Sequence, residues 1–154
     1  MQRRLMLTAP LLAWLPARAH HGWSSFDQNR PLWLEGRVAK VSWANPHAEL
    51  VLELPAEPKL PADLAGRALP AQSAAVDGPA LLKAAQLPTR KDRRWAIELA
   101  PLSRMEAWKV KPIQAGDTVA VLGFTFTGEK GAAVLRAEYL FAGGGVYGLR
   151  SAPA

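Results

Sequence analysis

Hydrophobic and polar residues alternate along five separate stretches of the chain, and this pattern predicts a small all-β domain. The alternation is clearest at Trp95, Ile97 and Leu99, where apolar residues recur at every second position. The expected strands span Leu32–Trp43, His47–Leu54, Arg94–Leu99, Asp117–Phe126 and Ala132–Phe141. With one short helix expected over Ser103–Lys109, this spacing is typical of a five- to six-stranded barrel resembling the OB-fold.

Turn residues predict how these strands connect. Asn45-Pro46 indicates a turn that pairs the first two strands as a hairpin, and the glycine-containing residues 127–131 indicate a loop that pairs the last two. Gly36, inside the first strand, indicates a bulge or a sharp bend. Such a bend lets one strand turn a corner between two sheets of a barrel.

A Pro/Ala-rich segment, residues 55–91, separates the second and third strands and is expected to be a long loop insertion at the surface. Asp77 is expected near the cap of a short helix over Ala80–Gln86. The segment is either a lid or binding loop, or an insertion without a role in binding. The second interpretation is favoured, because the segment contains no histidine and no aromatic residue.

Residues 1–19 have the three-part build of a secretory signal peptide. The basic, apolar and small-residue parts are Arg3 and Arg4, Leu5–Leu15, and Ala17 and Ala19. We expect cleavage after Ala19, a single domain over residues 20–145 and a C-terminal tail over residues 146–154. The product is expected to be periplasmic or secreted, with no stable membrane span after processing; a short uncleaved anchor is the alternative.

Charge and cysteine content narrow the classes of partner and site. Cleavage after Ala19 removes three arginines and leaves 16 basic and 13 acidic side chains, a net charge of +3 compared with +6 for the whole chain. So small an excess predicts no nucleic-acid binding by general electrostatics. The absence of cysteine excludes disulfides and thiolate ligands, so nitrogen and oxygen must hold any metal.

The histidines are the candidate metal ligands. Cleavage after Ala19 makes His20 the first residue, and its α-amine and Nδ1 can then chelate a transition metal. His21 follows directly, and His47 is the third histidine of the chain. Because the turn before His47 and the new N-terminus can lie at one end of a barrel, we predict a copper or zinc site at these three residues. Three carboxylates are chosen, by residue type alone, as hydrogen-bond acceptors that would fix the tautomer of a ligand histidine: Asp27, Glu49 and Glu98.

Other interpretations stay open at this point. Cleavage after Ala17 would place His20 third, a position that still suits Cu(II) or Ni(II). Without a metal, His47 caps its turn and the histidine pair is a solvated terminus. The tryptophans either line a ligand groove or fill the core, and core filling is favoured because Trp43 and Trp95 lie among apolar strand residues.

Several motifs together resemble a family of exported bacterial proteins, domain of unknown function 6152. They are His20-His21, Phe26-Asp27, Leu34-Glu35-Gly36-Arg37-Val38, Trp43-x-Asn45-Pro46-His47, Trp95-x-Ile97-Glu98 and Ala115-Gly116-Asp117-Thr118-Val119. The resemblance spans most of residues 20–141. It implies an exported location and a compact β domain, and the family has no established activity.

The sequence favours a binding role over catalysis. No serine lies in a glycine-framed elbow and no glycine loop has the setting that cradles phosphate, so we assign no catalytic residue and no organic cofactor. The predicted function is sequestration or delivery of copper or zinc. The alternative is a metal-free module that binds an envelope protein or a small ligand, and the oligomeric state is open.

Overall fold

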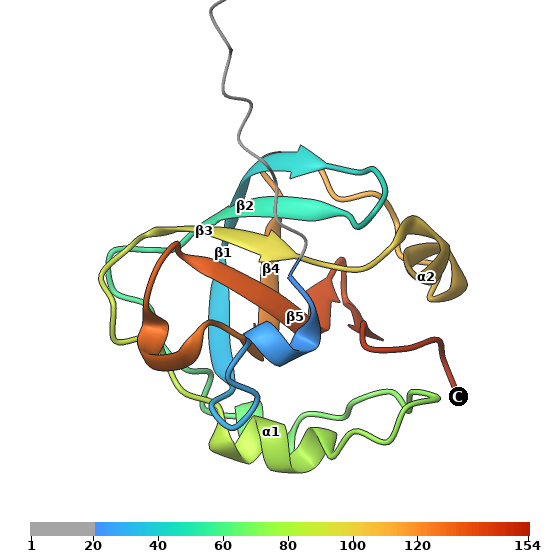
Figure 1. Cartoon of the computed structure of the whole chain (residues 1–154), viewed down its shortest axis with the longest axis horizontal. Helices are drawn as coiled ribbons and strands as arrows, with labels where there is room; N and C mark the ends of the chain where they lie inside the picture. Colours follow the sequence, from blue (N-terminus) through green and yellow to red (C-terminus); the bar gives the residue numbers. More distant parts are fainter. Residues whose placement is uncertain (1–20) are drawn as a thin grey trace, which may run out of the picture.

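The computed structural model describes residues 21–154, which form a closed five-stranded β-barrel with one additional strand (Figure 1). The strands are β1 (Leu32–Ser42), β2 (Glu49–Glu53), β3 (Arg94–Glu98), β4 (Thr118–Phe124), β5 (Val134–Ala142) and β6 (Gly145–Gly148). The helices are α1 (Gly78–Ala84) and α2 (Leu102–Ala107), with short 3-10 turns η1 (Trp23–Ser25), η2 (Leu64–Gly66) and η3 (Thr127–Glu129). The predicted small all-β barrel is confirmed; the expected signal peptide and His20 lie outside the described residues.

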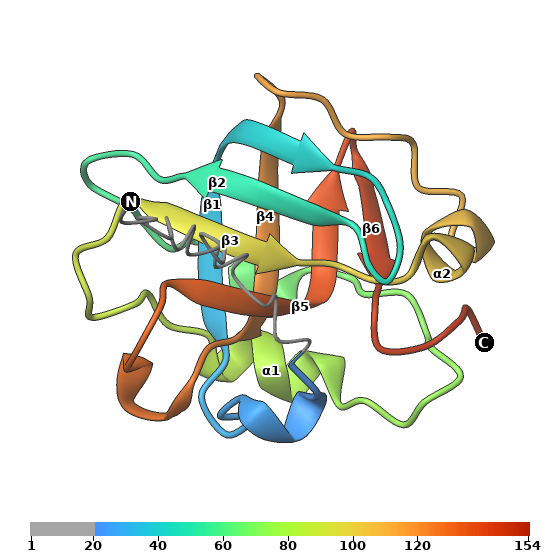
Figure 2. The same cartoon turned by 45° about the horizontal axis from the view of Figure 1, so that its top comes forward.

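A parallel pair closes the barrel. The strand order is β3-β2-β1-β4-β5-β6, and β3 also pairs with β5 through residues 96–98 and 134–136. The other strand pairs are antiparallel. Figures 1 and 2 show β1 and β4 running steeply across β2, β3 and β5. The five-stranded order, with α2 between β3 and β4, is the arrangement expected for an OB-like barrel.

Strand β1 turns the predicted corner between two neighbours. It pairs with β4 from Leu32 to Arg37 and with β2 from Arg37 to Ser42. A side chain at Gly36 would overlap the backbone carbonyl oxygen of Glu53, so this close approach requires glycine. The break in register lies between Val38 and Lys40, just after Gly36 rather than at it.

The inside of the barrel is an apolar core. Trp95 is fully buried there with Ile97, Val121 and Leu135. Trp33 is equally buried but on the outer side of β1, and Trp43 and Trp108 pack against the core from its margin. These four tryptophans therefore fill or cover apolar clusters, as favoured from the sequence.

The insertion over residues 55–91 is a packed part of the domain. Leu64 of η2 and Leu82 of α1 are buried against a second cluster on the outer side of β1, β4 and β5, which includes Trp33 and Tyr139. Asp77 caps α1 as predicted, because its Oδ1 accepts a hydrogen bond from Ala80 N at 3.0 Å. Figure 1 shows α1 lying beneath the barrel. The segment is therefore a second structural layer.

The prediction of a C-terminal tail over residues 146–154 is wrong, because these residues belong to the folded domain. Gly143 and Gly144 both have positive φ, 57° and 78°, and form the two-residue turn of a hairpin between β5 and β6. Leu149 is fully buried in the barrel core, and Pro153 forms a β-bridge with Gln72. The domain therefore continues beyond residue 145, and its last residues pack against the insertion.

One buried carboxylate joins three loops. Glu129, 8% exposed, accepts hydrogen bonds from the backbone N–H groups of Thr89 and Arg90 and from the Arg30 guanidinium. Burial alone would raise the pKa of Glu129, but these donors outweigh it and hold the pKa below its ordinary value. Glu129 thus ties the β4–β5 loop to the end of the insertion and to the segment before β1.

Candidate functional site

A row of charged side chains crosses three neighbouring strands on the outer face of the barrel. Glu49 of β2 lies opposite Glu98 of β3 in the antiparallel register. Glu98 in turn lies opposite Arg136 of β5 in the parallel register. Residues that lie opposite each other in a sheet share a face, so the three side chains form one row.

Each glutamate of the row has a histidine beside it. His21 Nδ1 lies 3.0 Å from Glu98 Oε1, and His47 Nδ1 lies 3.5 Å from Glu49 Oε1. The structure therefore pairs each of two predicted ligands with one of the carboxylates assigned by residue type. The side chain of His47 is 8% exposed and that of His21 is 32% exposed, so His47 is buried and His21 is partly open to solvent.

The row joins charges of both signs. Two carboxylates placed opposite each other in a sheet repel, unless positive charge lies near them. Arg136 supplies one such charge, with an Nη1 atom 3.4 Å from Glu98 Oε2. Burial lowers the pKa of Arg136 from its ordinary value, which is far above neutral pH, and it stays charged.

The N-terminal segment that carries His21 is held by a stack of aromatic and guanidinium groups. Two guanidinium groups contact the Trp23 ring: the Cζ of Arg150 is 3.9 Å from the ring centroid and that of Arg136 is 5.0 Å from it. Arg150 also donates hydrogen bonds to the fully buried carboxylate of Glu138, and Gln28 accepts another at 2.9 Å. The C-terminal part of the domain therefore fixes the position of η1.

Aromatic rings form the wall behind His21. The Phe26 and Phe126 rings stack with centroids 5.1 Å apart and an interplanar angle of 8°. The His21 ring meets Phe126 edge-on at 5.0 Å and Phe26 edge-on at 6.0 Å. This wall limits the directions in which the imidazole can turn, so its Nε2 edge has a restricted orientation.

The arrangement determines the chemistry that His21 can perform. An ionised carboxylate only accepts hydrogen bonds, so a neutral His21 donates Nδ1–H to Glu98 and keeps the lone pair on Nε2. Metal-binding histidines commonly have this carboxylate contact. Within residues 21–154, however, no group of three or more histidine and carboxylate side chains is arranged to hold a metal ion. A complete site needs a further ligand, and the predicted one, His20, lies outside this range.

The third carboxylate assigned by residue type lies in a local turn. Asp27 Oδ1 accepts a hydrogen bond from Asn29 N at 3.1 Å, and the Asp27 backbone N–H bonds to Thr125 O. This pattern is a turn that stabilises itself through an aspartate side chain. Asp27 therefore fixes the path of the chain after η1.

Arg136 and Arg150 are the residues that sequence reasoning missed. Arg136 and Glu138 are charged positions in an otherwise apolar stretch, residues 132–141, and that interruption was a usable signal. Arg150 offered no such signal, since it follows the glycine run that was interpreted as the end of the domain.

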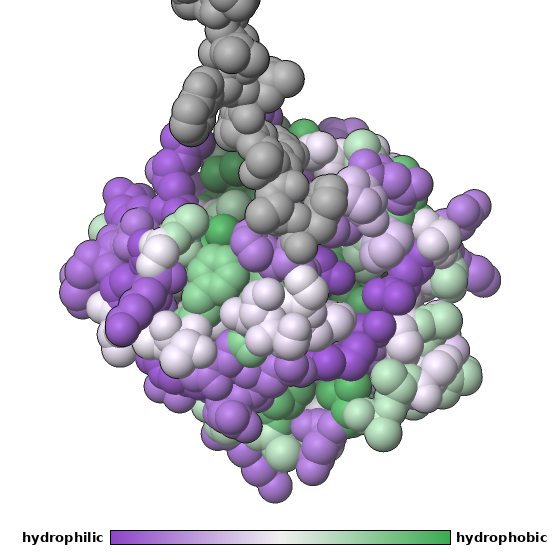
Figure 3. Space-filling model, in the orientation of Figure 1, coloured by the Kyte–Doolittle hydropathy of each residue, from purple (hydrophilic) through white to green (hydrophobic). Residues whose placement is uncertain are grey.

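The hydropathy of the surface is mixed. In Figure 3, apolar areas on the face seen in Figure 1 are small and separated by hydrophilic side chains. Among residues 21–154, Leu60, 40% exposed, is the only large hydrophobic side chain exposed to solvent. No helix in this range is both long and apolar enough to cross a membrane.

The fold defines a small OB-like barrel protein, and two histidine–glutamate pairs lie within it. A family model described as a family of unknown function, DUF6152, matches residues 11–59. The match confirms the resemblance for the stretch that contains the histidine pair and Asn45-Pro46-His47; the motifs at Trp95 and Ala115 lie beyond it. No curated protein matches the chain.

Proposed function

We propose that this protein is exported, to the periplasm or outside the cell, and binds a copper or zinc ion through His20, His21 and His47. One observation supports the proposal: His21 and His47 each contact a glutamate, and these two glutamates lie opposite each other on β2 and β3. Imidazole nitrogen suits both metals, and a carboxylate contact of the kind that Glu98 makes with His21 is common at metal-binding histidines. We propose that the role is metal sequestration or delivery.

The amine of a processed N-terminus completes the proposed ligand set. Cleavage after Ala19 would give His20 a free α-amine next to its own imidazole, and His21 would follow at the Glu98 carboxylate. Amine and imidazole nitrogens in one plane suit Cu(II) in particular. In this proposal Glu98 is a positioning residue for His21, and it does not bind the metal itself.

Replacing His47 with alanine is expected to weaken Cu(II) binding by about tenfold or more, because one imidazole ligand is lost. The measurement is isothermal titration of the chain that begins at His20 with Cu(II), and with Zn(II) as a second metal. Circular dichroism shows whether the variant keeps its fold. Equal affinity in the variant removes His47 from the site, and absence of binding to the unaltered chain overturns the proposal.

Replacing Glu98 with glutamine is expected to weaken Cu(II) binding, within the range of about 10- to 100-fold that loss of such a contact typically causes. The amide keeps the shape of the side chain but loses the charge that orients His21 Nδ1–H. Glu53→Gln is the matched control, because Glu53 is an exposed glutamate at the other end of β2. If the two variants bind Cu(II) equally well, Glu98 does not position a ligand.

A metal-free binding module remains the second candidate. A surface cavity of about 690 Å³ beside β1 favours it, since this volume lies in the range of ligand sites. Thermal melting separates the two candidates. A metal that binds only the folded state raises the melting temperature by mass action, whereas a metal-free module melts at the same temperature with and without Cu(II) or Zn(II).

A further inference from the structure

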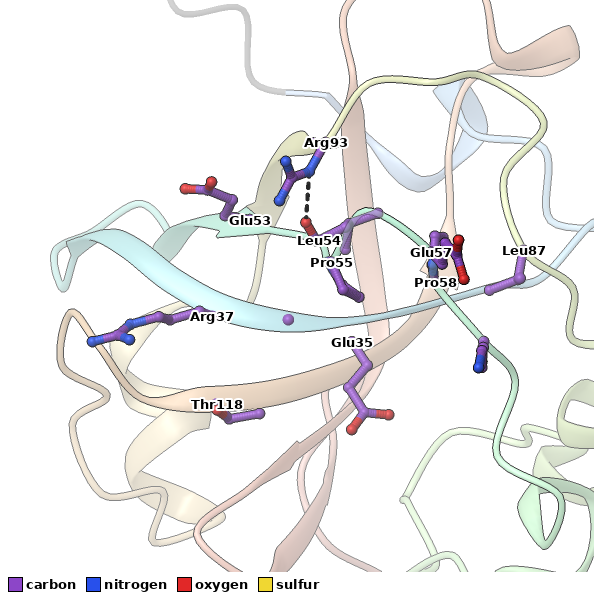
Figure 4. A pocket seen from close by; sticks show the side chains of 12 residues that line it. Glu35, Arg37, Glu53, Leu54, Pro55, Glu57, Pro58, Leu87, Arg93 and Thr118 are labelled. Atoms are coloured by element: carbon purple, nitrogen blue, oxygen red, sulfur yellow. Dashed lines mark hydrogen bonds between the residues drawn. The ribbon is translucent and has the colours of Figure 1, made fainter.

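We propose that Trp23 and Gln28 are positioning residues for His21, and that Arg150, near the C-terminal end of the chain, holds both of them. This role deepens the proposed function and rests on it, because it concerns how firmly His21 is presented to a metal ion. None of these residues lines the cavity beside β1 (Figure 4), so the role is separate from any ligand of that cavity.

The segment that carries His21 has few anchors of its own. Phe26, 5% exposed, is the first buried residue after His21, and η1, which lies between them, buries none of its residues. The N-cap residue of η1 is Gly22, which has no side chain to cap the turn. A chain terminus frays unless other parts of the domain hold it. The position of His21 therefore depends on contacts that the rest of the domain makes with η1.

Arg150 holds Trp23 in two ways. The Arg150 Cζ lies 3.9 Å from the centroid of the Trp23 ring, a close cation–π contact. Arg150 Nη2 also donates to Gln28 Oε1 at 2.9 Å, and Gln28 Nε2 donates to the Trp23 carbonyl oxygen at 3.2 Å. The guanidinium thus holds the indole ring directly and the main chain of Trp23 through Gln28.

Arg150 is itself fixed to the domain. Its Nε lies 2.8 Å from Glu138 Oε2, and the side chain of Glu138 in β5 is fully buried. The Arg150 backbone N–H donates to Gln72 Oε1 at 3.0 Å. Charge-assisted hydrogen bonds are short and strong, and burial of the acceptor strengthens them further. Both the main chain and the guanidinium of Arg150 are therefore restrained, as an anchor requires.

A second path joins Trp23 to His21. The Arg136 Cζ lies 5.0 Å from the Trp23 ring centroid, and Arg136 Nη1 lies 3.4 Å from Glu98 Oε2. The other oxygen of Glu98 lies 3.0 Å from His21 Nδ1. Glu98 thus orients the imidazole, whereas Trp23 fixes the main chain two residues away. A ligand that is already held in its bound geometry loses less conformational entropy on binding, so both restraints should raise the affinity for a metal.

Replacing Trp23 with leucine tests the restraint on the main chain. Leucine keeps apolar bulk but removes both cation–π contacts, so His21 should be held in place for a smaller fraction of the time. We expect about fivefold weaker Cu(II) binding, because the apparent affinity falls with the fraction of the competent state. The measurement is isothermal titration of the chain that begins at His20. Trp23→Phe, which keeps an aromatic face, should recover part of the affinity.

A matched pair of neighbouring variants tests the link through Gln28. Gln28→Ala removes that link and should weaken Cu(II) binding by about threefold, as for one exposed hydrogen bond. Asn29→Ala is the control, because Asn29 is also exposed and only its backbone N–H is hydrogen-bonded within residues 21–154. Circular dichroism shows that each variant keeps its fold. If Trp23→Leu and Gln28→Ala both bind Cu(II) as tightly as Asn29→Ala, the positioning role is overturned.

A measurement on the metal-free chain separates this role from the proposed function. In the unaltered chain the Gly22 backbone amide should have an NMR order parameter near about 0.85, and in Trp23→Leu it should fall below about 0.6. Equal rigidity in the two proteins would contradict the positioning role, whether or not a metal binds. Loosening of the segment together with no Cu(II) binding by the unaltered chain would instead overturn the proposed function, and with it any role of Trp23 at a metal site.

Discussion

Replacing Arg150 with alanine is expected to lower the free energy of unfolding by about 3 kcal/mol and the melting temperature by roughly 10 °C. Arg150 donates from both Nε and Nη2 to Glu138 Oε2, and the Glu138 side chain is fully buried. Without the guanidinium, the Gln72 amide, at 3.2 Å, is the one side-chain donor left to this carboxylate among residues 21–154. Thermal and urea unfolding followed by circular dichroism measure the loss.

A second substitution shows whether the unpaired Glu138 carboxylate causes the loss of stability. Adding Glu138→Gln to Arg150→Ala removes the buried carboxylate and should recover part of the stability. Asp63→Asn is the surface control, because the Asp63–Arg67 pair is exposed and its loss should leave the melting temperature nearly unchanged. A double variant no more stable than Arg150→Ala alone would contradict the explanation.

Replacing Glu129 with glutamine is expected to lower the free energy of unfolding at neutral pH by about 2 kcal/mol, because charge-assisted hydrogen bonds become neutral ones. The backbone N–H groups of Thr89 and Arg90 lie 2.8–3.0 Å from the carboxylate, and Arg30 lies 2.5 Å from it. The effect should be visible as a lower urea midpoint in equilibrium unfolding.

The pH dependence of that effect has a definite sign. The pKa of Glu129 is lower in the folded chain than its ordinary value of 4.5, so its charge stabilises the fold above that pH. The contribution disappears as the pH falls through the folded-state pKa. The difference between the two proteins should therefore shrink in acid, whereas the exposed control Glu57→Gln should follow the unaltered protein throughout. A difference independent of pH would contradict this account.

Local patterns predicted the parts of the fold that depend on neighbouring residues. The β1–β2 and β4–β5 hairpins followed from turn residues between alternating segments, and both pairs are present. The parallel closure of β3 on β5 joins residues nearly forty positions apart, and no local pattern specifies that register. The Gly143-Gly144 turn was interpreted as an end because its meaning depends on β6 pairing beyond it.

The second apolar layer was missed for a related reason. Leu64 and Leu82 lie in a Pro/Ala-rich segment without periodic apolar residues, so local pattern alone did not mark them as buried. Their partners, among them Trp33 and Tyr139, belong to strands with apolar residues on both faces. A strand that is apolar on both faces needs a cover on each side, and that requirement was available from the sequence.

The site was predictable in its residue types and not in its geometry. Histidines are scarce in this chain, so His21 and His47 could be named from the sequence. Glu49 and Glu98 were chosen by type, and only the β2–β3 register places them opposite each other. The link from Glu98 to Arg136 depends on the parallel β3–β5 pair, which sequence reasoning did not foresee.

The stretch that the family model matches can fold only as part of the whole barrel, which the β3–β5 pair closes. The matched stretch, residues 11–59, contributes only η1, β1 and β2 to the domain, and an isolated two-stranded hairpin is at best marginally stable in water. Its apolar side chains are covered by β3, β4 and β5, which come later in the chain. Any attempt to transplant the signature into another protein must therefore carry the whole barrel with it.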